Sequence, residues 1–112
     1  MKVAILSCLK ANDVCTGMGC LQSYHDKRDA FLIYKDEETR LMAFMHCNGC
    51  GTDPGIDEGM IEKLDRLQDN GVEVVHIGIC TKNKEGKLCT TIERIVQMLK
   101  ERDIKVVFGT HR

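Results

Sequence analysis

The chain has 112 residues, and its 43% hydrophobic and 29% charged residues are typical of an ordinary globular domain rather than a disordered segment. Its 16 basic and 17 acidic residues leave a formal net charge of −1, so no strong field favours nucleic acid or an anionic membrane. No apolar run approaches the roughly 20 residues of a membrane span, and residues 1–8 become polar too soon for a signal peptide. We therefore expect a single domain over residues 1–112 in the cytoplasm, without a nucleic-acid or membrane partner.

Four short, nearly continuous apolar segments predict strands that are buried on both faces of a parallel sheet. These segments are residues 3–6, 41–45, 72–79 and 104–108. Helical patterns separate them, and this alternation predicts an α/β fold, a small three-layer sandwich with a mostly parallel four-stranded sheet of Rossmann or flavodoxin-like type. The order of the strands stays open.

The first crossover, residues 18–34, suits a helix, although residues 31–35 also suit a short extra strand. Two parallel strands need a crossover between them, which favours the helix. The helix before the Asn-Gly turn at 70–71 begins near either Asp53 or Asp57. For the last helix we expect Thr90 as the N-cap residue and Glu93 as its partner in a capping box.

Cysteine is the outlier in the composition, with seven residues beside four histidines. A secreted disulfide scaffold favours an even number of cysteines and little regular structure. The odd number and the regular patterns instead indicate reduced thiols that bind a metal or carry out redox chemistry.

These residues lie where the predicted strands end. Cys8 follows the first strand, Cys47 and Cys50 follow the second, Cys80 follows the third, and His111 follows the fourth. Because the carboxyl ends of parallel strands share one edge of a sheet, where ligands commonly bind, we expect these side chains to lie together.

The remaining thiols are expected at the same edge. Cys15 and Cys20 lie in the loop after the first strand and at the start of its helix, and Cys89 directly precedes Thr90. The start of a helix lowers the pKa of a thiol, and the thiolate is the form that binds metal or attacks an electrophile.

The other histidines receive different interpretations. His76 alternates within the third strand and is expected to be a core histidine, whereas His25 is expected on an exposed helix face. His46 directly precedes Cys47, so it is either a ligand or the hydrogen-bond partner of one. The basic loop 82–87 is expected to be a solvated turn.

The Cys-Asn-Gly-Cys motif at 47–50 suits zinc, iron–sulfur and redox sites alike. Zinc takes four Cys or His ligands and iron–sulfur clusters use four cysteines, so the ligand type leaves both open. The motif also resembles a thioredoxin-type site, but that fold sets a cis-proline against the motif, and the only proline, Pro54, directly follows it. No phosphate-binding glycine motif occurs in the chain.

The order of these motifs resembles a known family: a strand ending in Cys8, Cys-Thr-Gly-Met-Gly-Cys at 15–20, a central Cys-x-Gly-Cys, two further cysteines, and Gly-Thr-His at 109–111. Over nearly its whole length the chain is similar to the CGGC-domain proteins, small prokaryotic proteins whose cysteines and histidines have suggested zinc binding. Asn48 stands where the family motif has its first glycine, and Thr90 stands where a proline is expected. The resemblance implies metal ligands at Cys8, Cys15, Cys20, Cys47, Cys50, Cys80, Cys89 and His111.

The first hypothesis is therefore a metal-binding protein with a thiolate-rich site for zinc or, alternatively, an iron–sulfur cluster. Its core ligands are expected to be Cys8, Cys47, Cys50 and Cys80, and eight candidates are too many for one tetrahedral ion. The alternatives are a thiol redox or sulfur-handling enzyme that uses Cys47 and Cys50, and an interaction module with a structural zinc. Enzymatic activity and oligomeric state stay open.

Overall fold

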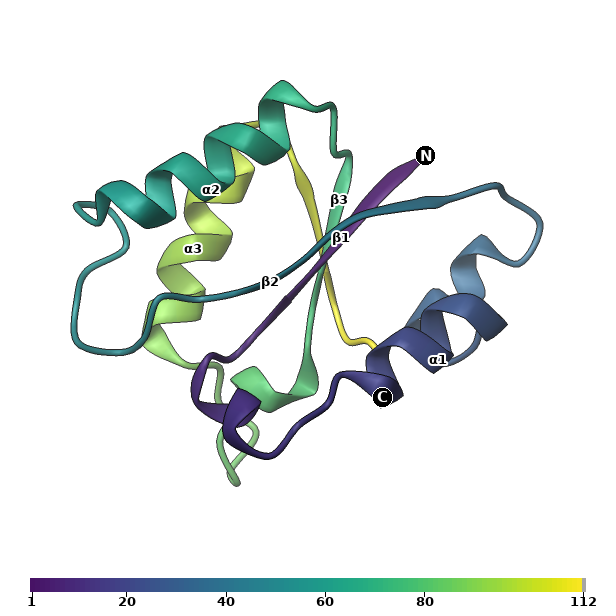
Figure 1. Ribbon diagram of the computed structural model, residues 1–112, viewed down its shortest axis with the longest axis horizontal. Helices are drawn as coiled ribbons and strands as arrows, with labels where there is room; N and C mark the ends of the chain where they lie inside the picture. The colour runs from purple at the N-terminus through teal and green to yellow at the C-terminus, as the bar shows by residue number, and fades with distance from the viewer. Residues whose placement is uncertain (112) are drawn as a thin grey trace.

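The computed structural model describes residues 1–111 and has an α/β fold, in which a parallel sheet carries helices on both faces (Figure 1). Within these residues, no helix combines the length and apolar character needed to cross a membrane. The strands are β1 (Lys2–Ser7), β2 (Arg40–His46), β3 (Val74–Ile77) and β4 (Lys105–Phe108), and the α-helices are α1 (Met18–Asp26), α2 (Glu58–Asp69) and α3 (Thr90–Glu101). The predicted fold class is confirmed.

The sheet has the strand order β2-β1-β3-β4, and every pairing is parallel. From β1 the chain passes through α1 to β2, at one edge of the sheet. From β3 it passes through α3, on the opposite face, to β4 at the other edge (Figure 1). The connections therefore diverge at the carboxyl ends of β1 and β3, which is where open parallel sheets form their ligand crevice.

Alternation along β1 divides the core into two parts. Val3 and Ile5 pack with the aromatic side chains on the α1 side, whereas Ala4 and Leu6 pack with α2 and α3. Because successive side chains of a strand point to opposite faces, one strand contributes to both cores. The α2–α3 core is mainly aliphatic, and the α1 core contains Tyr24, Phe31 and Tyr34.

The first crossover differs from the single helix expected over residues 18–34. Helix α1 ends at Lys27, which has a left-handed conformation with φ of 50°, and a 3₁₀ helix, η2 (Asp29–Tyr34), follows. The turn brings Phe31 onto the sheet, where its ring stacks on His76 with centroids 4.2 Å apart. The alternative of a strand at 31–35 is also wrong, because the aromatic side chains reach the sheet from a helical turn.

Helix α2 begins at the second of the two expected positions. The Asp57 side chain caps it by accepting hydrogen bonds from the N–H groups of Gly59 and Met60. The helix ends at Asn70, and Gly71 takes the left-handed conformation with φ of 75°. This end follows the predicted Asn-Gly signal.

Helix α3 begins one residue earlier than predicted. Its N-cap residue is Cys89 rather than Thr90, and no side-chain capping hydrogen bond forms there. The N–H of Cys89 donates to the Thr81 carbonyl at 2.8 Å, and this contact holds Cys89 outside the helical conformation. The expected capping box between Thr90 and Glu93 is therefore wrong.

His76 is fully buried, as expected for a core histidine, and both ring nitrogens have partners. Nδ1 lies 3.0 Å from the Gly109 carbonyl, and Nε2 lies 2.8 Å from the Tyr34 hydroxyl. Since a carbonyl can only accept, Nδ1 carries the proton and Nε2 accepts from Tyr34. Burial lowers the pKa of His76 despite the opposing effect of the Gly109 hydrogen bond, so the ring is neutral. His25 is exposed, also as expected.

Candidate thiol site at the carboxyl edge of the sheet

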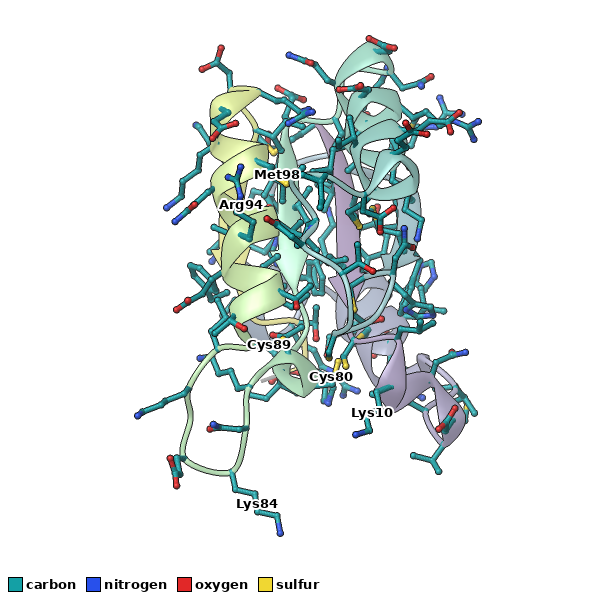
Figure 2. The ribbon with its side chains drawn as sticks, turned by 90° about the vertical axis from the view of Figure 1, so that its left-hand side faces the viewer. Lys10, Cys80, Lys84, Cys89, Arg94 and Met98 are labelled. Atoms are coloured by element: carbon teal, nitrogen blue, oxygen red, sulfur yellow. The ribbon has the colours of Figure 1, made fainter. Side chains whose placement is uncertain are left out.

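The turn after β1 draws together sulfurs from the ends of both neighbouring strands. The N–H of Cys8 donates to Cys80 Sγ at 3.3 Å, and the N–H of Leu9 donates to Cys47 Sγ at 3.4 Å. This arrangement follows from the strand order, because β1 lies between β2 and β3. Figure 2 shows Cys80 and Cys89 at the same end of the molecule.

The Cys-Asn-Gly-Cys loop continues β2 and then turns out toward solvent. The N–H of Cys47 donates to the Ser7 carbonyl at 3.1 Å, and Cys47 is only 2% exposed. Gly49 has a φ of 101°, a conformation that a residue with a Cβ rarely adopts. Cys50 is exposed beyond this turn. The motif therefore presents one buried and one exposed thiol.

Asn48, the residue that departs from the family motif, ties this loop to α2. Its side-chain carbonyl accepts from Lys63 Nζ at 2.6 Å, and its amide donates to Asp57 at 3.2 Å. Lys63 also donates to the His46 carbonyl at 3.0 Å. A glycine at this position could make none of the side-chain contacts, so the departure gives the loop an additional anchor.

Cys50 and Cys89 are close neighbours from different loops. Charge repulsion from Cys89 is the largest effect that raises the pKa of Cys50, followed by desolvation and the sulfurs of Cys47 and Cys8. Burial acts to raise the pKa of Cys89 as well. Four groups lower the pKa of Cys89 and together outweigh burial: the N–H groups of Ile92 and Thr91, the Thr91 hydroxyl and the Cys50 thiol. The N–H groups approach the sulfur without forming a regular cap.

The net shift at Cys89 is therefore downward, opposite to that at Cys50. The cause is the amino end of α3, where free N–H groups favour negative charge. As pH rises, the Cys89 thiol therefore loses its proton before the Cys50 thiol does.

A pocket of about 270 Å³ opens at the same edge on the α1 side of the sheet. Burial raises the pKa of Cys80, which lines this pocket, and the sulfurs of Cys8, Cys20 and Cys15 add smaller upward effects. The thiols and imidazoles of the pocket belong to Cys8, Cys15, Cys20, Cys80, His46 and His111.

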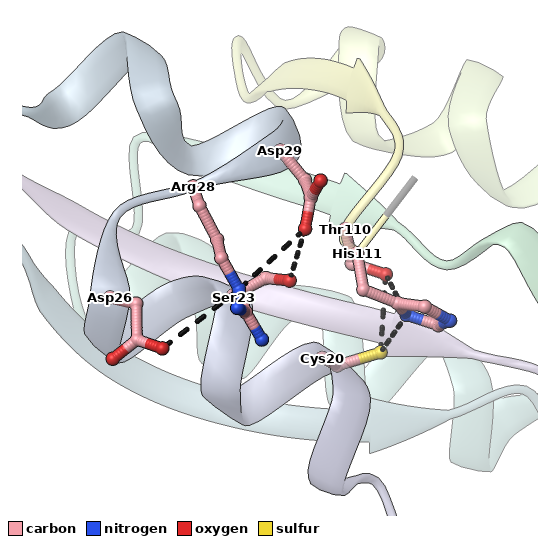
Figure 3. A network of polar contacts seen from close by, with 7 residues as sticks. All are labelled: Cys20, Ser23, Asp26, Arg28, Asp29, Thr110 and His111. Atoms are coloured by element: carbon pink, nitrogen blue, oxygen red, sulfur yellow. Dashed lines mark hydrogen bonds and ion pairs between the residues drawn. The ribbon is translucent and has the colours of Figure 1, made fainter.

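Cys20 and His111 meet in this pocket through a residue that sequence reasoning did not select. Cys20 Sγ lies 3.1 Å from the Thr110 hydroxyl and 3.7 Å from His111 Nδ1, and the hydroxyl lies 3.3 Å from the same nitrogen (Figure 3). A Cβ at Gly19 would lie only 3.3 Å from the His111 ring, so the absence of a side chain permits this approach. The Gly-Thr-His segment after β4 was the available signal, but only its histidine was interpreted.

Ser7 and His46 form a second polar pair on the pocket wall. The Ser7 hydroxyl lies 2.6 Å from His46 Nδ1, and the two residues pair in register at the ends of β1 and β2. Ser7 was not predicted, although a polar residue at the end of a buried strand was a usable signal. The contact fixes the orientation of the imidazole.

The predicted site residues therefore form two adjoining groups. Within residues 1–111, no three His, Cys, Asp or Glu side chains are arranged to hold a metal ion as they stand. The group on the α2–α3 side contains Cys8, Cys47, Cys50 and Cys89. The group on the α1 side contains Cys15, Cys20, Cys80 and His111, and Cys8 borders both.

Comparison with known proteins gives one family. A sequence model described as the CGGC domain matches residues 2–111, nearly the whole chain. No curated protein and no solved structure gives a significant match. The chain belongs to the CGGC domain family.

Proposed function

We propose that this protein binds a thiophilic metal ion, zinc in the first place, through Cys8, Cys47, Cys50 and Cys89. The observation that carries the proposal is the N–H of Leu9, directly after Cys8, which donates to Cys47 Sγ at 3.4 Å and so joins the turn after β1 to the Cys-Asn-Gly-Cys loop. Such hydrogen bonds stabilise thiolates and are a regular feature around metal-bound sulfur. The proposal differs from the sequence-based core set in one ligand, because Cys89 replaces Cys80.

The neighbourhood of Cys50 supports this choice. Cys89, Cys47 and Cys8 all raise the pKa of Cys50 through charge, and Cys89 has the largest effect. A cation placed among these thiols would reverse the effect, because it replaces the repulsion between thiolates with attraction. Cys80, by contrast, is influenced by Cys8, Cys20 and Cys15, and it faces the pocket.

The donor set fits zinc by its chemistry, since four thiolates are a common tetrahedral set. In residues 1–111 the side chains do not stand as a finished coordination shell, so binding requires the thiols to turn toward a common point. The loop that carries Cys50 can allow this movement. Cys50 is exposed, and a Cβ at the following Gly51 would meet nothing within 4 Å.

A bound ion would contribute folding stability by joining three loops. Cys8 follows β1, Cys47 and Cys50 follow β2, and Cys89 starts α3. A site with four protein ligands is closed and therefore structural, which leaves the adjacent pocket for other chemistry. Removing a ligand should release the ion and lower the free energy of unfolding together, because binding and folding are coupled.

The test is elemental analysis and an absorption spectrum of protein that is purified without oxygen or chelators. We expect a colourless protein with one zinc per chain. Cys47→Ser and Cys89→Ser should each lose most of the zinc, whereas Cys15→Ser, at an exposed thiol outside the ligand set, should retain it.

The Cys80→Ser variant decides between the two ligand sets. Retained zinc supports Cys89 as the fourth ligand, and lost zinc supports the set with Cys80. If the protein instead contains iron and is brown, the site holds an iron–sulfur cluster rather than zinc. Absence of metal, together with rapid alkylation of Cys47 and Cys50, would favour the thiol redox alternative and reject the proposal.

A further inference from the structure

The pocket on the α1 side contains a thiol–imidazole pair that the proposed metal site does not use. Cys20 Sγ lies 3.7 Å from His111 Nδ1 and 3.1 Å from the Thr110 hydroxyl (Figure 3). Cys20 is 5% exposed, yet both it and His111 line the pocket of about 270 Å³. The sulfur is sheltered from bulk water and faces a cavity of the size that accepts a small molecule.

The contacts around Cys20 give its sulfur a proton acceptor and a hydrogen-bond donor within reach. Once His111 Nδ1 has taken the thiol proton, the new N–H and the Thr110 hydroxyl can both donate to the sulfur. Cys20 also lies in the first turn of α1, where the helix favours negative charge. A thiol beside a base is the arrangement of a cysteine nucleophile.

The pocket walls indicate the kind of electrophile that would enter. Leu21, Phe44 and Ile79 supply apolar surface, and Cys15 and Cys80 add polarizable sulfur. A small neutral disulfide matches both properties. We propose that Cys20 and His111 form a nucleophilic pair that exchanges with low-molecular-weight disulfides entering this pocket.

In this reaction His111 Nδ1 takes the proton of the Cys20 thiol, and the sulfur attacks one sulfur of a disulfide R–S–S–R. The bond from Cys20 Sγ to that sulfur forms as the S–S bond breaks, and the leaving thiolate takes the proton from His111. The products are a mixed disulfide on Cys20 and one thiol R–SH. Cys20 is thereby oxidised, and the leaving sulfur is reduced.

The experiment treats the whole chain with bis(2-hydroxyethyl) disulfide at neutral pH and follows adduct formation at each cysteine by peptide mass spectrometry. Cys20 should react faster than the exposed Cys15, although exposure alone predicts the reverse order. His111→Gln should slow the reaction of Cys20 at least about tenfold and leave the rate at Cys15 unchanged. His25→Gln is the matched control, because His25 is an exposed histidine on α1, the helix that carries Cys20, and this variant should change neither rate.

A second variant guards against misfolding of His111→Gln, which circular dichroism would detect. Thr110→Val keeps the imidazole but removes one donor to the sulfur, and it should slow Cys20 several-fold. The zinc content of each sample is measured in parallel, so that failure of the proposed metal site can be distinguished from failure of this inference. Loss of the metal site alone should leave the reaction rate of Cys20 unchanged. An unchanged Cys20 rate in the folded variants, an unmodified Cys20 beside a modified Cys15, or loss of zinc from Cys20→Ser would overturn the inference.

Discussion

The two faces of the sheet bury different kinds of side chain, and each face holds one buried thiol. On the α2–α3 side Cys47 lies among aliphatic residues such as Leu64 and Leu99. On the α1 side Cys20 lies in a core with Tyr24 and Phe31. The comparison teaches that one edge of a sheet can serve two environments, because Cys47 follows a strand and packs on the α2–α3 face, whereas Cys20 stands on the helix that covers the opposite face.

The surroundings of the two thiols also differ in polarity. Cys47 Sγ accepts a hydrogen bond from a backbone N–H, whereas Cys20 Sγ meets a hydroxyl and an imidazole. The α1 side also holds the buried pair of Tyr34 and His76. We therefore expect the α1 side to respond to loss of polar contacts and to pH, and the α2–α3 side to respond to helix capping and to metal.

The largest effect is expected from Phe31→Ala. Phe31 is fully buried, stacks on His76 and meets Tyr24 edge-on, so its removal leaves a cavity in the α1 core. The free energy of unfolding should fall by about 3–5 kcal/mol in urea titrations. Phe108→Ala, at a residue that is 49% exposed, is the control and should change it much less. Similar losses in both variants would contradict this picture of the α1 core.

Tyr34→Phe should be the next largest change. It removes the hydroxyl that donates to His76 Nε2 and leaves a buried acceptor without a partner. We expect a loss of about 1–3 kcal/mol in the free energy of unfolding. Tyr24→Phe, whose hydroxyl accepts only a partly buried bond from Thr39, should cost less. A larger loss for Tyr24→Phe would reverse our ranking of polar contacts on this face.

His76 should make stability depend on pH. Burial lowers its pKa below 6.5, so between that value and the lower folded pKa the unfolded chain binds a proton that the folded chain does not. Stability is therefore fully present above pH 6.5 and is lost as pH falls through the folded pKa, with a slope of at most about 1.4 kcal/mol per pH unit. Urea titrations between pH 7 and pH 4 should show that His76→Gln removes this component. An equal slope in wild type and variant would show that His76 does not titrate differently on folding.

Asp57→Ala should give the smallest effect and tests the α2–α3 side. The substitution removes two hydrogen bonds at the start of α2 and the contact with Asn48 in the Cys-Asn-Gly-Cys loop. We expect a loss of about 0.5–2 kcal/mol, measured by thermal unfolding. Asp69→Ala is the control, because it removes an aspartate at the other end of α2 that does not cap the helix. Equal effects would show that the cap does not stabilise this face.

Much of the fold could be read from local patterns. Continuous apolar segments predicted all four strands, but the expected burial on both faces holds only for β1 and β3, because β2 and β4 are the edges of the sheet. Asn70-Gly71 marks the end of α2 because few other residues adopt the required turn. The first crossover was predicted in part: the expected helix forms over residues 18–26, but it does not continue to residue 34, because packing of Phe31 on His76 requires the break at Lys27. Tertiary contact overrode local preference there.

The sequence by itself determined that thiols follow three of the strands and that another thiol lies at the start of a helix. Parallel topology places such positions at one edge of the sheet. Only the tertiary structure decided which thiols are neighbours. Strand order brings Cys8 beside Cys80, and the position of Cys89 at the N-cap of α3 sets it near Cys50. The physical reason is that local patterns specify where a strand ends, whereas the face that each side chain reaches depends on packing between segments distant in the chain.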